Sequence, residues 1–279
     1  MPIHSDGYRP YLGRRHTHER AWLVITAAGV RAVFLNRRLL GLLLVAWVPF
    51  VVRAVQIYAA TNFPQAPFLQ ISPNMFHDFL RQQDLFVFFI TVWVGSGLIA
   101  NDLRSNALQV YFSKPVTRAA YVGGKLGILA CFLLLVTWLP AMLLLVVQAA
   151  LAGDLRFLAA NTFVIPAITI ASLVPVLMSS LTILALSSFS KSARFVAITY
   201  AGLVFFSEAV FNVVRATTRR TTMSWLSPSA TMNQIGDAVF RVRPSFETPI
   251  AVSLAAMAVL IAVSLLVLAK RVRAVEVVA

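Results

Sequence analysis

Few residues of this sequence could carry catalytic chemistry, and their spacing argues against an ATPase. A phosphate-cradling loop needs the pattern G-x-x-x-x-G-K-[ST], in which backbone amides surround the phosphates and the lysine reaches them. The sequence has one Gly-Lys pair, Gly124–Lys125, with Ala119 in place of the first glycine and Leu126 in place of the Ser or Thr. We therefore expect that the chain does not bind or hydrolyse ATP in this way.

The other candidate ligands and nucleophiles are also poorly placed for catalysis. The sequence contains neither H-E-x-x-H nor G-x-S-x-G, and its histidines are not spaced as a metal site; they are His4, His16, His18 and His77. The longest apolar runs contain one acid, Glu208, and no histidine. An intramembrane hydrolase would need paired acids, or a base beside a nucleophile. We therefore predict a non-enzymatic chain that binds no metal and no cofactor of its own.

Two charged residues, Arg53 and Glu208, lie inside apolar runs. A charge in hydrocarbon is costly unless it faces protein or water. Both residues fall in the outer half of their runs, so one alternative is that they form an ion pair. The other is that each side chain extends on its own to the outer membrane surface. The sequence leaves both alternatives open.

The elements that must position these residues are membrane-spanning helices. Of the 279 residues, 59% are hydrophobic and 12% are charged, whereas about a quarter of the residues in a soluble domain are charged. A helix needs about 20 predominantly apolar residues to cross the hydrocarbon layer. The sequence predicts an all-α integral membrane protein with six spans at about 39–60, 85–100, 126–151, 163–189, 195–214 and 249–269. The second run is the shortest, and an outward extension to Gln82 is left open.

The distribution of basic residues predicts the orientation of the chain. Lys and Arg collect at the cytoplasmic ends of spans, beside anionic lipid, and the loops 101–125 and 190–194 are richer in them than the loops 61–84 and 152–162. This explains the net charge of +14 and indicates membrane lipids, not nucleic acid, as partners. The predicted parts are a cytoplasmic tail with an interfacial helix at 1–38, a six-span domain at 39–269 and a cytoplasmic tail at 270–279.

Two segments outside the spans are predicted to form short helices. One apolar helical face before the first span consists of Trp22, Ile25, Val30, Val33 and Phe34. Because Arg37 and Arg38 would be costly in hydrocarbon, this pattern favours an interfacial helix on the inner membrane surface over an extension of the first span. The apolar residues within 215–248 favour short helices that dip back toward the membrane over a solvated loop.

The inner loop 101–125 combines charged, aromatic and helix-breaking residues. One predicted helical face consists of Leu103, Ala107, Val110 and Tyr111. The residue before a proline avoids helical backbone, so Lys114–Pro115 should end this helix near Phe112, and Thr117 can cap the next helix. We expect a short cytoplasmic helix, a proline break and a rigid return to the membrane, which together could move as a lever attached to two spans.

This loop resembles the cytoplasmic coupling region of type-2 ABC exporter permeases. In that family an acidic residue follows the second span, and a Ser-Lys/Arg-Pro-Val-Ser/Thr-Arg run, an aromatic residue and Gly-Lys lead into the third. The matching positions are Asp102, Ser113, Lys114, Pro115, Val116, Thr117, Arg118, Tyr121, Gly124 and Lys125. One departure is Asn106–Ala107, where the family pattern has a glycine and a small residue. The six-span plan, the interfacial helix and the longer last outer loop also match the family.

The resemblance implies a permease subunit of an ATP-binding cassette transporter in the bacterial cytoplasmic (inner) membrane, with both termini in the cytoplasm. It implies two kinds of partner: a second permease subunit, identical or different, and separate cytoplasmic ATPase subunits that bind the ATP. The loop would then contact an ATPase through an apolar face with a basic rim. The implied coupling residues are Asp102, Leu103, Arg104, Val110, Tyr111, Phe112, Lys114, Pro115, Arg118 and Lys125.

Two other functions fit a six-span chain without catalytic motifs. A membrane anchor or assembly subunit of an envelope machine would not transport anything itself. An ion-coupled carrier would bury several ionisable groups near the middle of the membrane, and the predicted spans hold few. Copurification separates the classes, because a permease of this family needs an ATPase partner and an ion-coupled carrier does not.

Overall fold

The computed structural model describes residues 20–63, 71–113, 116–153 and 156–272. Within these ranges the chain is helical and forms no strand. Six helices are long and apolar enough to cross a membrane, which confirms the predicted all-α membrane fold. They are Arg37–Asn62 (α2 and α3), Pro73–Arg104 (α4, η3 and α5), Arg118–Ala152 (α7 and α8), Val164–Ser187 (α10), Ala193–Thr218 (α11) and Ile250–Arg271 (α13).

Three of the spanning helices are built from shorter segments. The segments are α2 (Arg37–Ala46), α3 (Val48–Asn62), α4 (Pro73–Ile90), η3 (Thr91–Gly95), α5 (Ser96–Arg104), α7 (Arg118–Val136) and α8 (Trp138–Ala152). The first span is interrupted at Trp47 and the third at Thr137, and a proline follows each interruption, at Pro49 and Pro140. Proline lacks the amide hydrogen and crowds the carbonyl four residues earlier, so the helix is interrupted just before it.

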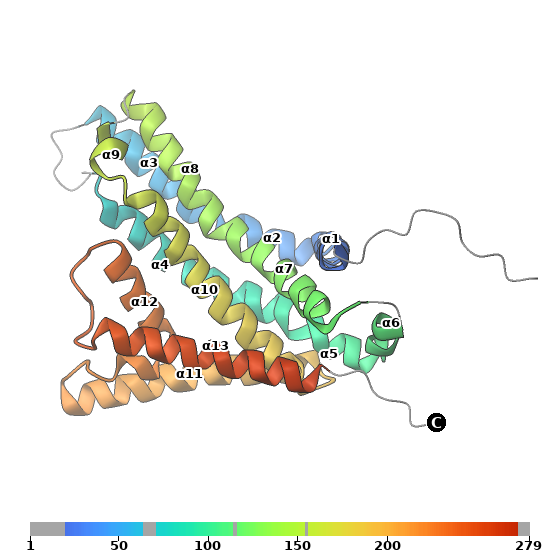
Figure 1. The fold of residues 1–279 in the computed structure, drawn as a ribbon. Coiled ribbons are helices and arrows are strands. Elements are labelled where there is room, and N and C mark those ends of the chain that lie inside the picture. Colours follow the sequence, from blue (N-terminus) through green and yellow to red (C-terminus); the bar gives the residue numbers. More distant parts are fainter. Residues whose placement is uncertain (1–19, 64–70, 114–115, 154–155, 273–279) are drawn as a thin grey trace, which may run out of the picture.

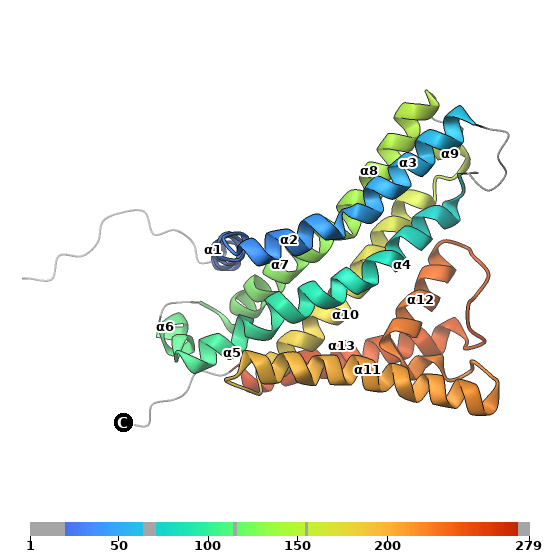
Figure 2. The ribbon, with the colours of Figure 1, turned by 180° about the vertical axis from the view of Figure 1, so that it is seen from behind.

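The short helices lie at the two ends of the bundle (Figure 1). They are α1 (Ala21–Phe34), α6 (Ala107–Ser113), α9 (Arg156–Ala160), η4 (Ser224–Leu226) and α12 (Pro228–Val239). The chain turns sharply between α1 and α2, so that α1 is seen nearly end-on in Figures 1 and 2, as expected for an interfacial helix. At the opposite end α12 packs against α10, α11 and α13, which confirms short helices in the last outer segment.

The second spanning helix is longer than the sequence predicted. It begins at Pro73, not at Leu85, and therefore includes Asp84. The predicted bounds of 85–100 exclude this acid, because the apolar run begins after it, and only the extension to Gln82 would include it. The statement that Glu208 is the one acid within the spans is therefore wrong.

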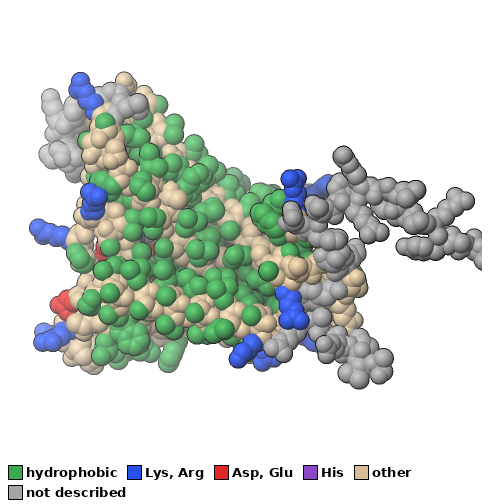
Figure 3. Space-filling model, viewed as in Figure 1, with side chains coloured by type: hydrophobic (Ala, Val, Ile, Leu, Met, Phe, Trp, Pro, Cys, Tyr) green, Lys and Arg blue, Asp and Glu red, His purple; other side chains and the backbone are tan. Residues whose placement is uncertain are grey.

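The helix α10 forms the centre of the bundle, and the outer helices expose their apolar side chains. Two thirds of the most apolar part of α10 is buried (67%), against 17% for α11 and 11% for α13. Figure 3 shows hydrophobic side chains covering the middle of the molecule, with Lys and Arg at its two ends. Such a surface is suited to lipid or to another membrane subunit.

One wide helical turn, η3, fixes α5 against α10. A π-type turn frees backbone groups that an α-helix would pair, and here the Ser187 hydroxyl oxygen at the end of α10 accepts hydrogen bonds from the amides of Ile99 (3.2 Å) and Ala100 (2.9 Å). Gly95 permits this close approach, because a Cβ there would lie 2.6 Å from the Ile183 side chain. The position of α5 therefore depends on α10.

Candidate functional site

A largely buried ion pair joins the second and third spanning helices at the end of the bundle where α6 lies. The Lys125 ammonium on α7 lies 2.7 Å from a carboxylate oxygen of Asp102 on α5, and the Tyr121 hydroxyl donates a hydrogen bond to the same oxygen over 2.7 Å. Lys125 is 7% exposed. Both residues are among the predicted coupling positions, but no sequence pattern indicates that they pair.

The helix α6 contributes an aromatic side chain to this ion pair. The Tyr111 ring lies 5.2 Å from the Tyr121 ring, and the Lys125 ammonium lies 5.9 Å from the centre of the first ring and 5.4 Å from the second. Burial, and then the Asp102 carboxylate, raise the pKa of the Tyr111 phenol above its ordinary value, so the ring stays neutral and can attract the ammonium. We call Asp102, Tyr111, Tyr121 and Lys125 the Asp102–Lys125 cluster.

The energetics of this cluster favour a role in positioning over a role in stability. Burying two charges costs desolvation energy that their attraction offsets only with good geometry, so a buried pair is a weak net stabiliser. Removing one partner, however, costs about 3–5 kcal/mol, because the other charge is left uncompensated. The cluster therefore penalises any arrangement that separates α5 from α7.

The other face of α7 contacts the interfacial helix α1 at the same level. The Thr26 hydroxyl on α1 donates a hydrogen bond to the Gly124 carbonyl over 3.1 Å. A Cβ at Gly124 would lie 2.7 Å from the Ile25 side chain, and one at Gly127 would lie 2.6 Å from Thr26. In the Gly124–Lys125 pair, the glycine thus permits the contact with α1 and the lysine forms the ion pair with α5.

The turn between α5 and α6 explains the departure from the family pattern. Asn106 has a φ of 53°, in the left-handed region that glycine adopts freely and that asparagine tolerates better than most other residues. The expected cap of α7 is confirmed, because the Thr117 hydroxyl oxygen accepts a hydrogen bond from the Ala120 amide over 3.1 Å. The predicted break at Lys114 and Pro115 lies outside the described residues.

The prediction that Leu103, Ala107, Val110 and Tyr111 share one helical face is wrong. Tyr111 packs inward against the core beside the buried Leu108, whereas the adjacent Val110 is 63% exposed. Leu103 belongs to α5 and also packs on the core. Among the predicted rim residues, Arg104 and Arg118 are exposed.

Phe112 is another of the predicted coupling residues. It lies within α6, but its side chain is outside the described residues. Lys114, the third predicted rim residue, is likewise undescribed.

Arg53 and Glu208 do not pair. The Arg53 guanidinium on α3 donates to the Gln56 side-chain oxygen over 2.9 Å. The Glu208 carboxylate on α11 accepts from the Ser227 hydroxyl and, over 3.4 Å, from Asn212. No ion pair joins the two charges, both of which lie in the described ranges, because α3 packs on α4 and α8 while α11 packs on α5, α10 and α12.

Comparison with known proteins finds one family whose sequence profile matches the whole helical bundle. The sequence profile of a family described as "ABC-2 family transporter protein" matches residues 36–272, from just before α2 to the end of α13. The match therefore includes the six spanning helices and the complete Asp102–Lys125 cluster. No curated protein sequence matches the chain.

Proposed function

The chain belongs to the ABC-2 family of transporter proteins, and on that premise we propose that its α6 region couples separate ATPase subunits to a translocation path. The chain is a membrane permease subunit of an ABC transporter and crosses the membrane several times. In the proposed complex the ATPase subunits bind and hydrolyse the ATP, this chain binds no cofactor, and a second permease subunit completes the path.

The charges at the α6 end support a cytoplasmic location for that end. The exposed basic residues there are Arg20, Arg31, Arg37, Arg38, Arg104, Arg118, Lys191, Arg194, Lys270 and Arg271. The acid beside them, Asp102, is already paired with Lys125. This excess of positive charge is typical of the inner side of a bacterial cytoplasmic membrane, beside anionic lipid. Both termini would then lie in the cytoplasm, since α1 and the end of α13 are at this end (Figure 1).

The proposed contact with the ATPase is formed by the outward side of α6. Val110 is the large apolar side chain exposed there among the described residues, and Arg104 and Arg118 are exposed on the neighbouring helices. An apolar anchor that enters a groove, surrounded by charges, is the usual arrangement at protein interfaces. Tyr111, which packs inward, would not contact the ATPase but would hold α6 in place.

Motion of α6 would reach four helices, α5, α7, α10 and α1, through the Asp102–Lys125 cluster. Tyr111 joins α6 to the ion pair, and the ion pair joins α5 to α7. From α5, the bonds to Ser187 lead to α10, and from α7, the close contact at Gly124 leads to α1. The observation that carries the proposal is the buried 2.7 Å ion pair between the two spanning helices that α6 connects.

The test compares two lysine substitutions in the purified permease–ATPase complex. Lys125→Met should leave the ATPase bound but reduce permease-dependent ATP hydrolysis about tenfold or more, because α5 and α7 no longer move together. Lys191→Met removes an exposed lysine from the other short loop at this end and should change neither quantity. Normal permease-dependent hydrolysis in the Lys125→Met complex would contradict the proposal.

A further inference from the structure

The acids inside and beside the spanning helices differ in whether the protein satisfies them. Asp102 pairs with Lys125, and Glu208 accepts from Ser227 and Asn212. Asp237 on α12 lies 3.5 Å from His77 and accepts from the Ser245 amide over 2.7 Å. They all have partners in the fold.

Asp84 differs from these acids, and also from Asp78 on the same helix, which is exposed to solvent. In the described part of the chain no hydrogen bond and no ion pair reaches its carboxylate. Arg81, one helical turn earlier, is exposed, and its positive charge acts on the Asp84 carboxylate from a distance without forming an ion pair. A charge within a spanning helix is costly, and such residues usually face the interior and mark a path for an ion or a substrate. Without a hydrogen bond or close ion pair in the described part of the chain, the Asp84 carboxylate is available to an external partner.

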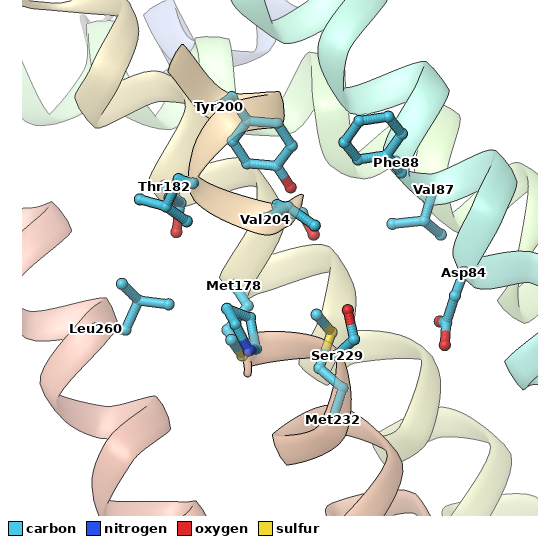
Figure 4. A pocket seen from close by; sticks show the side chains of 13 residues that line it. Asp84, Val87, Phe88, Met178, Thr182, Tyr200, Val204, Ser229, Met232 and Leu260 are labelled. Carbon is cyan, nitrogen blue, oxygen red and sulfur yellow. The ribbon is translucent and has the colours of Figure 1, made fainter. Parts of the chain in front are cut away.

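Asp84 borders a pocket between α4, α10, α11 and α12 (Figure 4). The hydroxyls of Tyr200 and Ser229 point into the space that Asp84 approaches from α4. The Phe88 and Tyr200 rings are stacked with their centres 6.0 Å apart. Asp84 is the one charged side chain among the described residues that line this pocket. A carboxylate beside aromatic rings and hydroxyls is the chemistry that recognises an organic cation.

A larger apolar groove adjoins this polar pocket. The pocket beside Asp84 is small, about 50 Å³, whereas the groove between α11, α12 and α13 measures about 470 Å³. The two share four lining residues, which are Met178, Leu203, Pro228 and Leu260. The exposed Trp225 and the half-buried Leu226 contribute to the groove wall. A small charged end and a larger apolar body describe an amphiphilic ligand.

We propose that this composite site binds a lipophilic organic cation, with its charged centre beside Asp84 and its apolar body along the groove. An anion would be repelled by the carboxylate, and a neutral apolar molecule would leave Asp84 without a partner. The identification of this ligand as cargo rests on the proposed permease function, but the binding itself does not.

The test uses two ions of the same shape and opposite charge. Tetraphenylphosphonium and tetraphenylborate are measured by equilibrium dialysis on the permease–ATPase complex in lipid nanodiscs, with empty nanodiscs subtracted. The cation should bind and the anion should not. Asp84→Asn should weaken binding of the cation about tenfold or more, which corresponds to about 1.4 kcal/mol. Asp78→Asn removes an exposed acid from the same helix, outside the pocket, and should leave binding unchanged.

Equal binding of both ions, or undiminished binding of the cation to Asp84→Asn, would show an apolar groove without a cation site and would overturn the inference. The dialysis requires no ATP hydrolysis. Loss of coupling in the Lys125→Met complex would therefore leave this result standing, and loss of cation binding would leave the coupling proposal standing.

Discussion

Asp84 and Asp102 lie on the same spanning helix and have opposite surroundings. Asp102 has a lysine 2.7 Å away and a tyrosine hydroxyl bonded to it, whereas Asp84 borders a pocket and has no partner within the described chain. A carboxylate that has an ion pair and a hydrogen bond within the protein can hold helices together. A carboxylate that has neither is available to a ligand. The contrast is the basis of the two proposals, which place mechanical coupling at the α6 end of this helix and ligand recognition nearer its other end.

The sharpest contrast is expected in stability. Lys125→Met should lower the free energy of unfolding by about 2 kcal/mol or more, because it leaves the partly buried Asp102 carboxylate without its cation. Denaturant unfolding of the purified permease in detergent measures this change. Lys191→Met provides the exposed control, with an expected change within about 0.5 kcal/mol. A Lys125→Met variant as stable as the parent would remove the energetic basis of the cluster.

Substitutions of the adjacent residues Val110 and Tyr111 should distinguish binding of the ATPase from transmission of its motion. Val110→Asp should weaken ATPase capture about tenfold or more and leave permease stability unchanged, because it places a charge in the proposed apolar contact. Tyr111→Ala should instead lower stability by about 2 kcal/mol or more and leave the affinity for the ATPase closer to normal. Pull-down titrations and unfolding curves give the two quantities. The reversed pattern would show that the inward and outward sides of α6 are wrongly assigned.

Asp84→Asn should change stability in the opposite direction from the lysine variant. Replacing an unpaired carboxylate by an amide of the same shape removes a desolvation cost, so the free energy of unfolding should stay the same or rise by about 1 kcal/mol. The same unfolding experiment measures it. A loss of about 2 kcal/mol or more would mean that Asp84, like Asp102, has a partner within the protein, and would contradict the contrast between the two acids.

The smallest effect is expected at the turn between α5 and α6. Asn106→Gly should stabilise the permease slightly or leave it unchanged, because glycine adopts the φ of 53° without strain. Asn106→Val should cost about 1–2 kcal/mol at the same position. Unfolding curves of the two variants check the order, and equal stability would contradict the assignment of backbone strain to this residue.

The sequence was sufficient for features set by composition and local chemistry. The six spans follow from apolar length, the cap at Thr117 follows from its hydroxyl, and the turn at Asn106 occupies the place of the family glycine. The 3.6-residue period could not place Val110 and Tyr111, because α6 has only seven residues and its direction is set by the packing of Tyr111 on Tyr121.

Other features depend on the tertiary arrangement. The Asp102–Lys125 pair joins residues on two helices, and the sequence around either residue does not indicate its partner. Asp84 was missed for a different reason, because the apolar run ends beside it while the helix continues to Pro73. A search for acids just outside each apolar run, within the length of one helix, would have found it.

The most direct test of coupling through the Asp102–Lys125 pair is a double-mutant cycle on permease-dependent ATP hydrolysis. Asp102→Asn and Lys125→Met are measured singly and together in the reconstituted permease–ATPase complex. If the two residues act as one tie between α5 and α7, each single variant loses coupling and the double variant loses no more than either. If the losses of permease-dependent ATP hydrolysis add in the double variant, or if the single variants hydrolyse ATP at the parent rate, coupling through the Asp102–Lys125 pair is contradicted.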